Sequence, residues 1–236
     1  MTPEAKSEGM SLAADIYVRR LTNREGIRKW YSGRRAAKAV KALERNGFSA
    51  CFVDSKEEAR QKILELVPDG AAVGAGGSIT IREIGVLDVL KERGHRLYDH
   101  WAPGLTQEQV LAIRRAQLTC DVFLTSANAV TSDGRLVCCD GAGNRVAAMA
   151  FGPKKVVVAV GANKIVCDLD TALRRVKEVA APQALRDTGI AVPCVETGHC
   201  QDCDSPQRGC RVTLILERKP YFTDIAVVVV GESLGF

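Results

Sequence analysis

The sequence lacks any stretch long and apolar enough to cross a membrane. Its longest apolar runs are residues 156–162 and 225–231, well below the roughly 20 residues that a spanning helix needs. Both runs are rich in valine, which is typical of buried strands. The first residues also lack the apolar core of a secretory signal. We therefore expect a cytoplasmic protein with no membrane partner.

Histidine is scarce, and familiar catalytic patterns are absent with it. The chain has only three histidines, and no Ser/His/Asp order or His-Glu-x-x-His pattern is recognisable. His95 and His100 flank Tyr98 and give no nucleophile–base arrangement. The sequence therefore does not support hydrolase chemistry of a recognised type.

Cysteine, by contrast, is abundant. An odd count of nine argues against a secreted disulfide framework, so we expect reduced thiols. Five of them lie in or beside apolar runs and are expected to be small buried hydrophobes: Cys51, Cys120, Cys138, Cys139 and Cys167.

The other four cysteines form a cluster with the spacing Cys194-x5-Cys200-x2-Cys203-x6-Cys210, beside His199. A Cys-x2-Cys pair with two flanking thiols predicts a tetrahedral sulfur site for zinc or an iron–sulfur cluster. The alternatives are ordinary thiols or a reversible Cys200–Cys203 disulfide. The spacing does not choose between the two metals.

Positive charge is concentrated at the N-terminal end. The net charge is +5, and residues 1–48 hold eleven Lys/Arg against five Asp/Glu, a local excess of six. One interpretation is a surface for RNA or an acidic partner. The charges follow helical spacing without forming a continuous tract, which favours a solvated helix face over a nucleic-acid site.

Strand and helix patterns alternate along the rest of the chain. We expect helices at residues 10–47, 56–67, 106–118, 144–150 and 168–179, and one helix from the glycines at 76–77 to residue 93. We expect strands at residues 49–54, 71–75, 96–99, 120–125, 155–160, 211–217 and 224–230, and a hairpin at 128–139 around Asp133-Gly134. This order predicts an α/β fold with a mostly parallel sheet, helices on both faces and an antiparallel hairpin. Residues 1–48 would be a helical extension of one structural domain, with the α/β part at 49–236.

The first glycine constellation runs from Gly74 to Glu83, between an expected strand and helix. Backbone amides at such a helix start favour an anion, although neither a Walker A loop nor the dinucleotide fingerprint is present. The competing interpretation is structural, because Thr80-x-x-Glu83 has the spacing of a capping box. By spacing alone the cap is favoured.

Other polar clusters also follow expected strands. Asp140-Gly-Ala-Gly-Asn-Arg145 offers a guanidinium for a carboxylate or phosphate, or else is a tight turn with Asn144 as the helix cap. Residues 125–128 and 161–164 lie at two further strand ends. Because ligands bind beyond the carboxyl ends of parallel strands, we expect these clusters to meet at one edge of the sheet.

Several motifs together resemble the LUD (lactate-utilisation, LutC-type, DUF162) family. They are Gly-Gly-Ser-Ile-Thr-Ile-Arg-Glu-Ile-Gly at 76–85, Thr-Ser-Ala-Asn-Ala-Val-Thr at 125–131, Asp-Gly-Ala-Gly-Asn-Arg-Val at 140–146, Gly-Pro-Lys-Lys-Val-Val-Val at 152–158, Gly-Ala-Asn-Lys-Ile-Val at 161–166, and the closing Val-Gly-Glu-Ser-Leu-Gly-Phe. Ser126 and Ala127 stand where the family has Gly-Thr. The cysteine cluster is typical of small stand-alone members, not of LutC proper.

The resemblance implies a fold like that of the NagB/RpiA/CoA-transferase group. It also implies a role near the oxidation of lactate to pyruvate beside iron–sulfur oxidoreductase partners. We expect a small anionic metabolite as ligand, and the apolar hairpin suggests a homodimer. The alternatives are a cysteine-cluster redox accessory and, less favoured, a nucleic-acid-binding module.

These arguments yield a set of candidate residues. Proton transfer is expected from Glu83 and Asp140, and metal binding from Cys194, Cys200, Cys203 and Cys210. Ligand binding is expected from Gly76, Gly77, Ser78, Thr80, Asn128, Gly141, Gly143, Asn144, Arg145, Asn163 and Lys164.

Overall fold

The structure is a computed structural model that describes residues 23–236. Its strands are β1 (Ser49–Val53), β2 (Ala72–Ala75), β3 (Arg96–Asp99), β4 (Val122–Thr125), β5 (Ala129–Thr131), β6 (Leu136–Asp140), β7 (Lys155–Gly161), β8 (Ile165–Val166), β9 (Val212–Leu216) and β10 (Asp224–Val230). Its α-helices are α2 (Arg24–Arg45), α3 (Lys56–Leu66), α4 (Ile79–Ile84), α5 (Val86–Glu92), α6 (Gln107–Ala116), α7 (Asn144–Ala150), α8 (Leu169–Arg175), α9 (Ala181–Asp187) and α10 (Pro193–Thr197).

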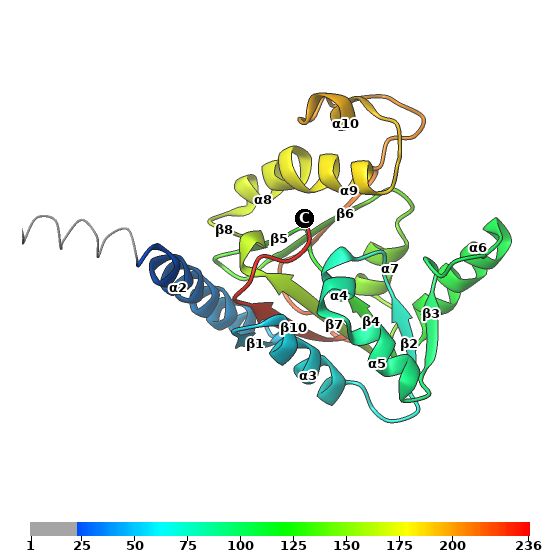
Figure 1. Cartoon of the computed structure of the whole chain (residues 1–236), viewed down its shortest axis with the longest axis horizontal. Coiled ribbons are helices and arrows are strands. Elements are labelled where there is room, and N and C mark those ends of the chain that lie inside the picture. The colour runs from blue at the N-terminus through cyan, green and yellow to red at the C-terminus, as the bar shows by residue number, and fades with distance from the viewer. Residues whose placement is uncertain (1–22) are drawn as a thin grey trace, which may run out of the picture.

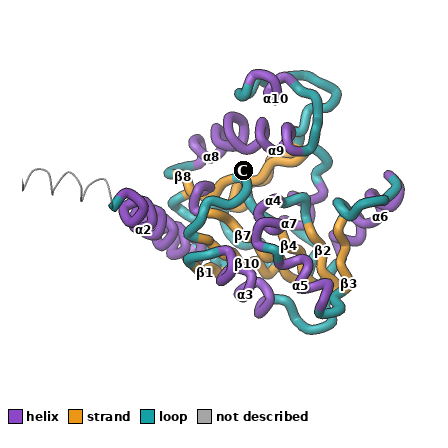
Figure 2. The backbone as a smooth tube through the Cα atoms, in the orientation of Figure 1, coloured by secondary structure: helices purple, strands orange, loops and turns teal. Residues whose placement is uncertain are grey.

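Six strands form a central sheet in the order β1-β10-β7-β4-β2-β3, and every neighbouring pair is parallel. The valine-rich runs of β7 and β10 lie side by side in the middle, with Val228 opposite Ala159. Figures 1 and 2 show helices packed around these strands. The expected α/β fold with a mostly parallel sheet is confirmed.

Alternation along β7 shows how the sheet is covered on both faces. Val156, Val158 and Val160 face a core shared with α2 and α7. Val157 and Ala159 face the opposite core, shared with α3, α4 and α5. Because β7 is buried on both sides, its sequence is continuously apolar instead of alternating with polar residues.

A second sheet has the order β8-β5-β6-β9. It contains the expected hairpin, in which Ala129 pairs with Val137 in antiparallel register. The last two strands belong to different sheets, since β9 joins this sheet and β10 joins the central one. Val130 and Leu136 are buried in the main core and Val137 lies beneath α8. The apolar hairpin is therefore largely buried within the chain, and the homodimer stays a prediction.

Two helices differ from the expected pattern. The helix expected to run to residue 93 is broken at Gly85, whose φ of 70° is left-handed and ends α4 before α5 begins. The helix expected to end at residue 179 continues instead. A π-helical turn, Val176–Ala180, connects α8 to α9, so helical structure extends to Asp187.

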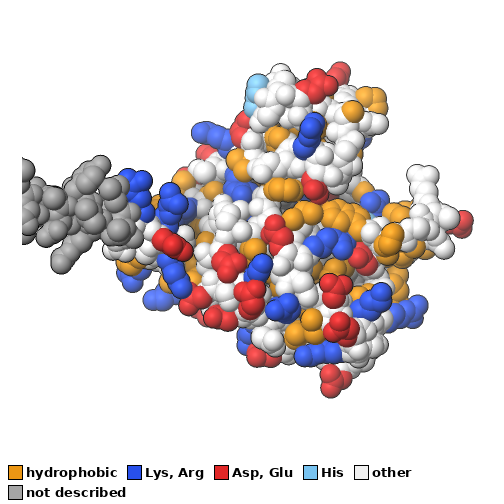
Figure 3. All heavy atoms as spheres, in the orientation of Figure 1, with side chains coloured by type: hydrophobic (Ala, Val, Ile, Leu, Met, Phe, Trp, Pro, Cys, Tyr) orange, Lys and Arg blue, Asp and Glu red, His pale blue; other side chains and the backbone are white. Residues whose placement is uncertain are grey.

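Helix α2 is amphipathic. Ala36, Ala39 and Leu43 on one face are fully buried in the core, so this helix packs into the fold. Its basic residues lie largely on the exposed face, and Figure 3 shows acidic side chains among them on the visible side. The first part of the expected helical segment, residues 10–22 with Arg19 and Arg20, lies outside the described residues. Among the helices of residues 23–236, none has the length and apolar character that crossing a membrane requires.

Candidate functional site

A cleft of about 300 Å³ opens beyond the carboxyl ends of β2, β4 and β7. Three of the expected clusters reach it directly, each from the loop after its strand: Gly77 and Ser78, Ser126 to Asn128, and Lys164. A fourth follows β6, and α9 lines another wall with Ala181, Ala184 and Leu185. In Figure 1 the end of the chain lies between α9 and the central sheet, and Phe236 contributes to the lining.

Lys164 is a buried amine in this cleft, with a residue exposure of 3%. Its Nζ donates hydrogen bonds to Thr80 Oγ1 at 2.8 Å and Ser126 Oγ at 3.1 Å. No Asp or Glu of the described chain forms an ion pair with it. Burial, assisted by the positive charges of Arg175 and Arg145, lowers the pKa of Lys164 to about 7.

Arg175 is a second buried cation behind the cleft wall. Its Nη1 donates to the carbonyl of Asn128 at 2.6 Å and its Nε to the carbonyl of Asn163 at 3.3 Å. Within residues 23–236 it has no carboxylate partner, and burial lowers its pKa. Two basic groups are thus held out of water without an acidic counter-charge, which is costly unless a ligand or a shifted pKa compensates.

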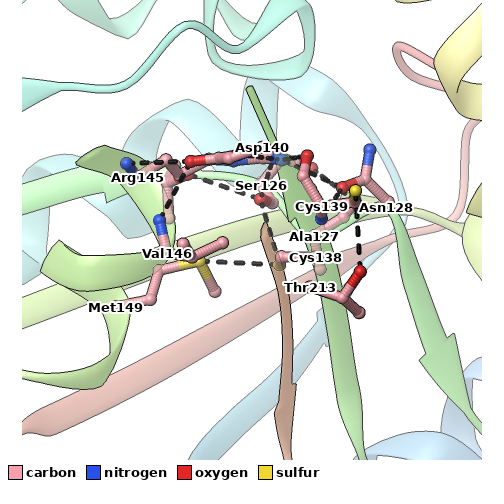
Figure 4. A network of polar contacts seen from close by, with 11 residues as sticks. Ser126, Ala127, Asn128, Cys138, Cys139, Asp140, Arg145, Val146, Met149 and Thr213 are labelled. Atoms are coloured by element: carbon pink, nitrogen blue, oxygen red, sulfur yellow. Dashed lines mark hydrogen bonds and ion pairs between the residues drawn. The ribbon is translucent and has the colours of Figure 1, made fainter. Parts of the chain in front are cut away.

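Arg145 and Asp140 form the centre of a polar network (Figure 4). Arg145 Nε donates to Asp140 Oδ1 at 2.8 Å, and Nη2 donates to Asn128 Oδ1 at 2.9 Å and to the carbonyl of Cys139 at 2.7 Å. Nη1 donates to the carbonyl of Ser126 at 3.3 Å. All three side-chain nitrogens of Arg145 therefore donate to the loops of the cleft. Few of its N–H groups remain for the predicted clamp on a carboxylate or phosphate.

Asp140 also starts helix α7. Its Oδ2 accepts hydrogen bonds from the backbone N–H of Arg145 at 3.0 Å and Val146 at 3.1 Å. The predicted cap at Asn144 is wrong, because Asn144 is already the first helical residue and the preceding Gly143 has no side chain to cap with. Asp140 lines the cleft as predicted, but its oxygens are occupied by structural donors.

Asn128 lines the cleft. Its Oδ1 accepts from Arg145 and from the backbone N–H of Cys139 at 2.9 Å. In Figure 4 its Nδ2 points away from this network, with no contact drawn to it. It is a donor available to a ligand.

Glu83 and Asn163 lie elsewhere than predicted. Glu83 is exposed and accepts a hydrogen bond from Gly235 N at 2.7 Å. Asn163 donates to the carbonyl of Gly235 at 3.1 Å and accepts from Leu234 N at 3.2 Å. Neither lines the cleft. Both hold the C-terminal tail, which places Phe236 at the cleft wall.

The predicted capping box at Thr80 and Glu83 is also wrong. Ser78 is the N-cap of α4, and its Oγ accepts from Ile81 N at 3.3 Å. Thr80 therefore lies within the helix, and its hydroxyl is free to meet Lys164. Of the other predicted glycines, Gly141 lines the cleft whereas Gly76 and Gly143 do not.

The segment after β3 supplies cleft residues that were not predicted: His100, Trp101 and Arg114. A Cβ on Gly77 would lie 2.8 Å from the Trp101 ring, so glycine is needed there. Burial, with Arg114 nearby, lowers the pKa of His100. His100 directly follows a strand of the parallel sheet, so the strand-end rule could have identified it.

The four clustered cysteines line one small cavity, but they are not grouped as a metal site in the described chain. Within residues 23–236, no three or more His, Cys, Asp or Glu side chains are grouped so that they could hold an ion. Cys194 is buried with Leu185 and Val192 in an apolar cluster. Cys210 lines the cleft, where its hydrogen bond lowers the pKa of Cys139 to about 6. The predicted zinc or iron–sulfur site is therefore not supported.

Comparisons with known proteins identify the family of this chain. A crystal structure of a DUF162 family protein from Deinococcus radiodurans is similar, with 14% identity and a TM-score of 0.48, over 84% of this chain and 98% of that one. No curated protein matches the sequence. The model of the LUD domain matches residues 36–230, which include every loop of the cleft except the end of the tail. The chain belongs to the LUD-domain family.

Proposed function

We propose that the cleft binds a small anionic metabolite, the carboxylate of a 2-hydroxy or 2-oxo acid such as lactate or pyruvate. The observation that carries this proposal is the excess of buried positive charge. Arg145 is balanced by Asp140, but Lys164 and Arg175 have no carboxylate partner in the described chain. An anion in the cleft would supply the missing charge.

The cleft residues have distinct roles in this proposal. Protonated Lys164 faces the carboxylate, and the free amide of Asn128 donates a further hydrogen bond. Arg145 holds Asn128 and the carbonyl of Ser126 in place. Asp140 keeps Arg145 oriented. Glu83 has no part, because it contacts the tail outside the cleft.

Family membership supports a place in lactate utilisation. In this role the chain would hold the acid, and iron–sulfur partner proteins would carry electrons during oxidation to the 2-oxo acid.

The test is a thermal-shift screen of small carboxylates, sugar phosphates and CoA esters. A ligand at 100 times its Kd stabilises the fold by about 2.7 kcal/mol. Lys164→Met should abolish the shift caused by lactate or pyruvate, and Lys62→Met, at an exposed pair with Glu65, should leave it unchanged. Absence of any carboxylate shift in the wild type, or an unchanged shift in folded Lys164→Met, would reject the proposal.

A further inference from the structure

The Ser126 hydroxyl has no part in the proposed anion binding, yet it lies beside Lys164. Ser126 directly follows β4, is 3% exposed and lines the cleft. Its Oγ lies 3.1 Å from Lys164 Nζ, and Thr80 Oγ1 lies 2.8 Å from the same nitrogen. A hydroxyl, a base within hydrogen-bond reach and a third group that orients the base are the parts of an activated nucleophile.

The direction of the hydrogen bonds is consistent with this arrangement. The Thr80 hydroxyl donates to the carbonyl of Leu234 at 3.4 Å, so it accepts from Lys164. A neutral Lys164 amine can therefore donate one N–H to Thr80 and direct its lone pair at the Ser126 hydroxyl. The other acceptor near that hydroxyl is the adjacent carbonyl of Ala127 at 3.3 Å.

We propose that Ser126 is a nucleophile, with Lys164 as its general base, for acyl transfer from small carboxylic esters or thioesters. The proposal uses the same cleft as the proposed function but goes beyond it. Anion binding needs the charged amine, whereas acyl transfer needs the neutral one. Serine–lysine pairs carry out this chemistry on several unrelated folds.

The surroundings of Lys164 favour the neutral form. Burial and the positive charges of Arg175 and Arg145 lower its pKa to about 7, and Cys138 and Glu83 act weakly in the opposite direction. A base whose pKa lies near neutrality suits proton transfer at physiological pH.

The reaction balances with the groups present and water. Lys164 Nζ takes the hydroxyl proton as Ser126 Oγ attacks the acyl carbon, and the bond to the leaving alcohol or thiol breaks. The ammonium returns the proton to the leaving group, which gives an acyl-serine and a free alcohol or thiol. Water, activated by the same amine, then releases the carboxylic acid and restores Ser126. The Asn128 amide is a donor in the same cleft for the transient oxyanion.

The experiment treats the full chain with a serine-directed fluorophosphonate and follows labelling by intact mass and peptide mapping. We expect one label on Ser126, formed at a rate that rises with pH through about 7. Ser126→Ala should not be labelled, and Ser49→Ala, at an exposed position in β1, should label like the wild type. Lys164→Arg keeps the charge but is too weak a base, so labelling should slow by about 100-fold. Hydrolysis of p-nitrophenyl acetate should change in parallel.

Three results would overturn the proposal: no label in the wild type, a label elsewhere than Ser126, or a rate that does not depend on pH around neutrality. The pH profile is measured on the wild type, so it decides even if Lys164→Arg does not fold. Thermal shifts with lactate and pyruvate separate the two proposals. A wild type that shows these shifts but no label supports anion binding and rejects acyl transfer. A wild type that is labelled on Ser126 but shows no shift supports acyl transfer and rejects anion binding.

Discussion

Replacing Asp140 by alanine should cause a large loss of stability. Asp140 and Arg145 have side-chain exposures of 9% and 13%, so neither group is well solvated. Removal of the carboxylate leaves the guanidinium unpaired and takes the acceptor from the backbone N–H groups of Arg145 and Val146. Breaking one partner of a buried pair costs about 3–5 kcal/mol.

Urea unfolding followed by circular dichroism measures this loss, because the midpoint shift at a constant slope gives the change in free energy. The control is Glu65→Ala, which removes an exposed pair with Lys62 and should change the stability little. The reasoning is refuted if Asp140→Ala loses no more than this control. A folded Asp140→Ala should also bind small carboxylates more weakly, since Arg145 no longer holds Asn128 in place.

Two substitutions test local features of the fold. Gly134→Ala should lower Tm, because Gly134 has a φ of 88° and an added Cβ would lie 2.6 Å from the carbonyl oxygen of Ala42. The left-handed backbone alone costs about 1–2 kcal/mol, and an unchanged Tm would contradict the packing of the hairpin on α2. Thr106→Ala should cost about 1 kcal/mol, measured by urea unfolding, because it removes the capping box that Thr106 forms with Gln109 at the start of α6. A loss below a few tenths would mean that this cap contributes nothing.

The arrangement of the cleft was predictable because it follows from one rule of parallel sheets. Loops after neighbouring parallel strands meet at one edge. Gly77, Asn128 and Lys164 follow β2, β4 and β7, and the structure brings all three to the same cleft. Strand identity was readable from continuous apolar runs, so the positions of these loops were readable too.

The roles of individual polar residues were less predictable. Glu83 and Asn163 also follow glycine-rich loops, but they bind the tail, and the contact of Glu83 with Gly235 spans 152 positions in the sequence. A capping residue and a ligand-binding residue have the same local pattern. Asp140, predicted for proton transfer, accepts the first N–H groups of the helix, whereas Asn144, the predicted cap, lines the cleft. Only the three-dimensional contacts distinguish them.

The sequence predicted that these loops meet, but it did not predict which of their side chains form pairs. Ser126 and Lys164 are 38 positions apart and follow two different strands, β4 and β7. The spacing of the four clustered cysteines suggested a metal, yet the thiol next to Cys210 is that of Cys139, on β6.

The central claim is that an anion pairs with the buried amine of Lys164. Titration calorimetry with lactate and pyruvate, in two buffers of different ionisation enthalpy, counts the protons taken up on binding. The free amine has a pKa of about 7, and an anion beside it would raise that pKa. Binding above neutral pH should therefore take up a proton, affinity should fall as pH rises above about 7, and the corresponding neutral amides should not bind. Binding without proton uptake, with the same affinity on both sides of neutrality, would contradict the claim.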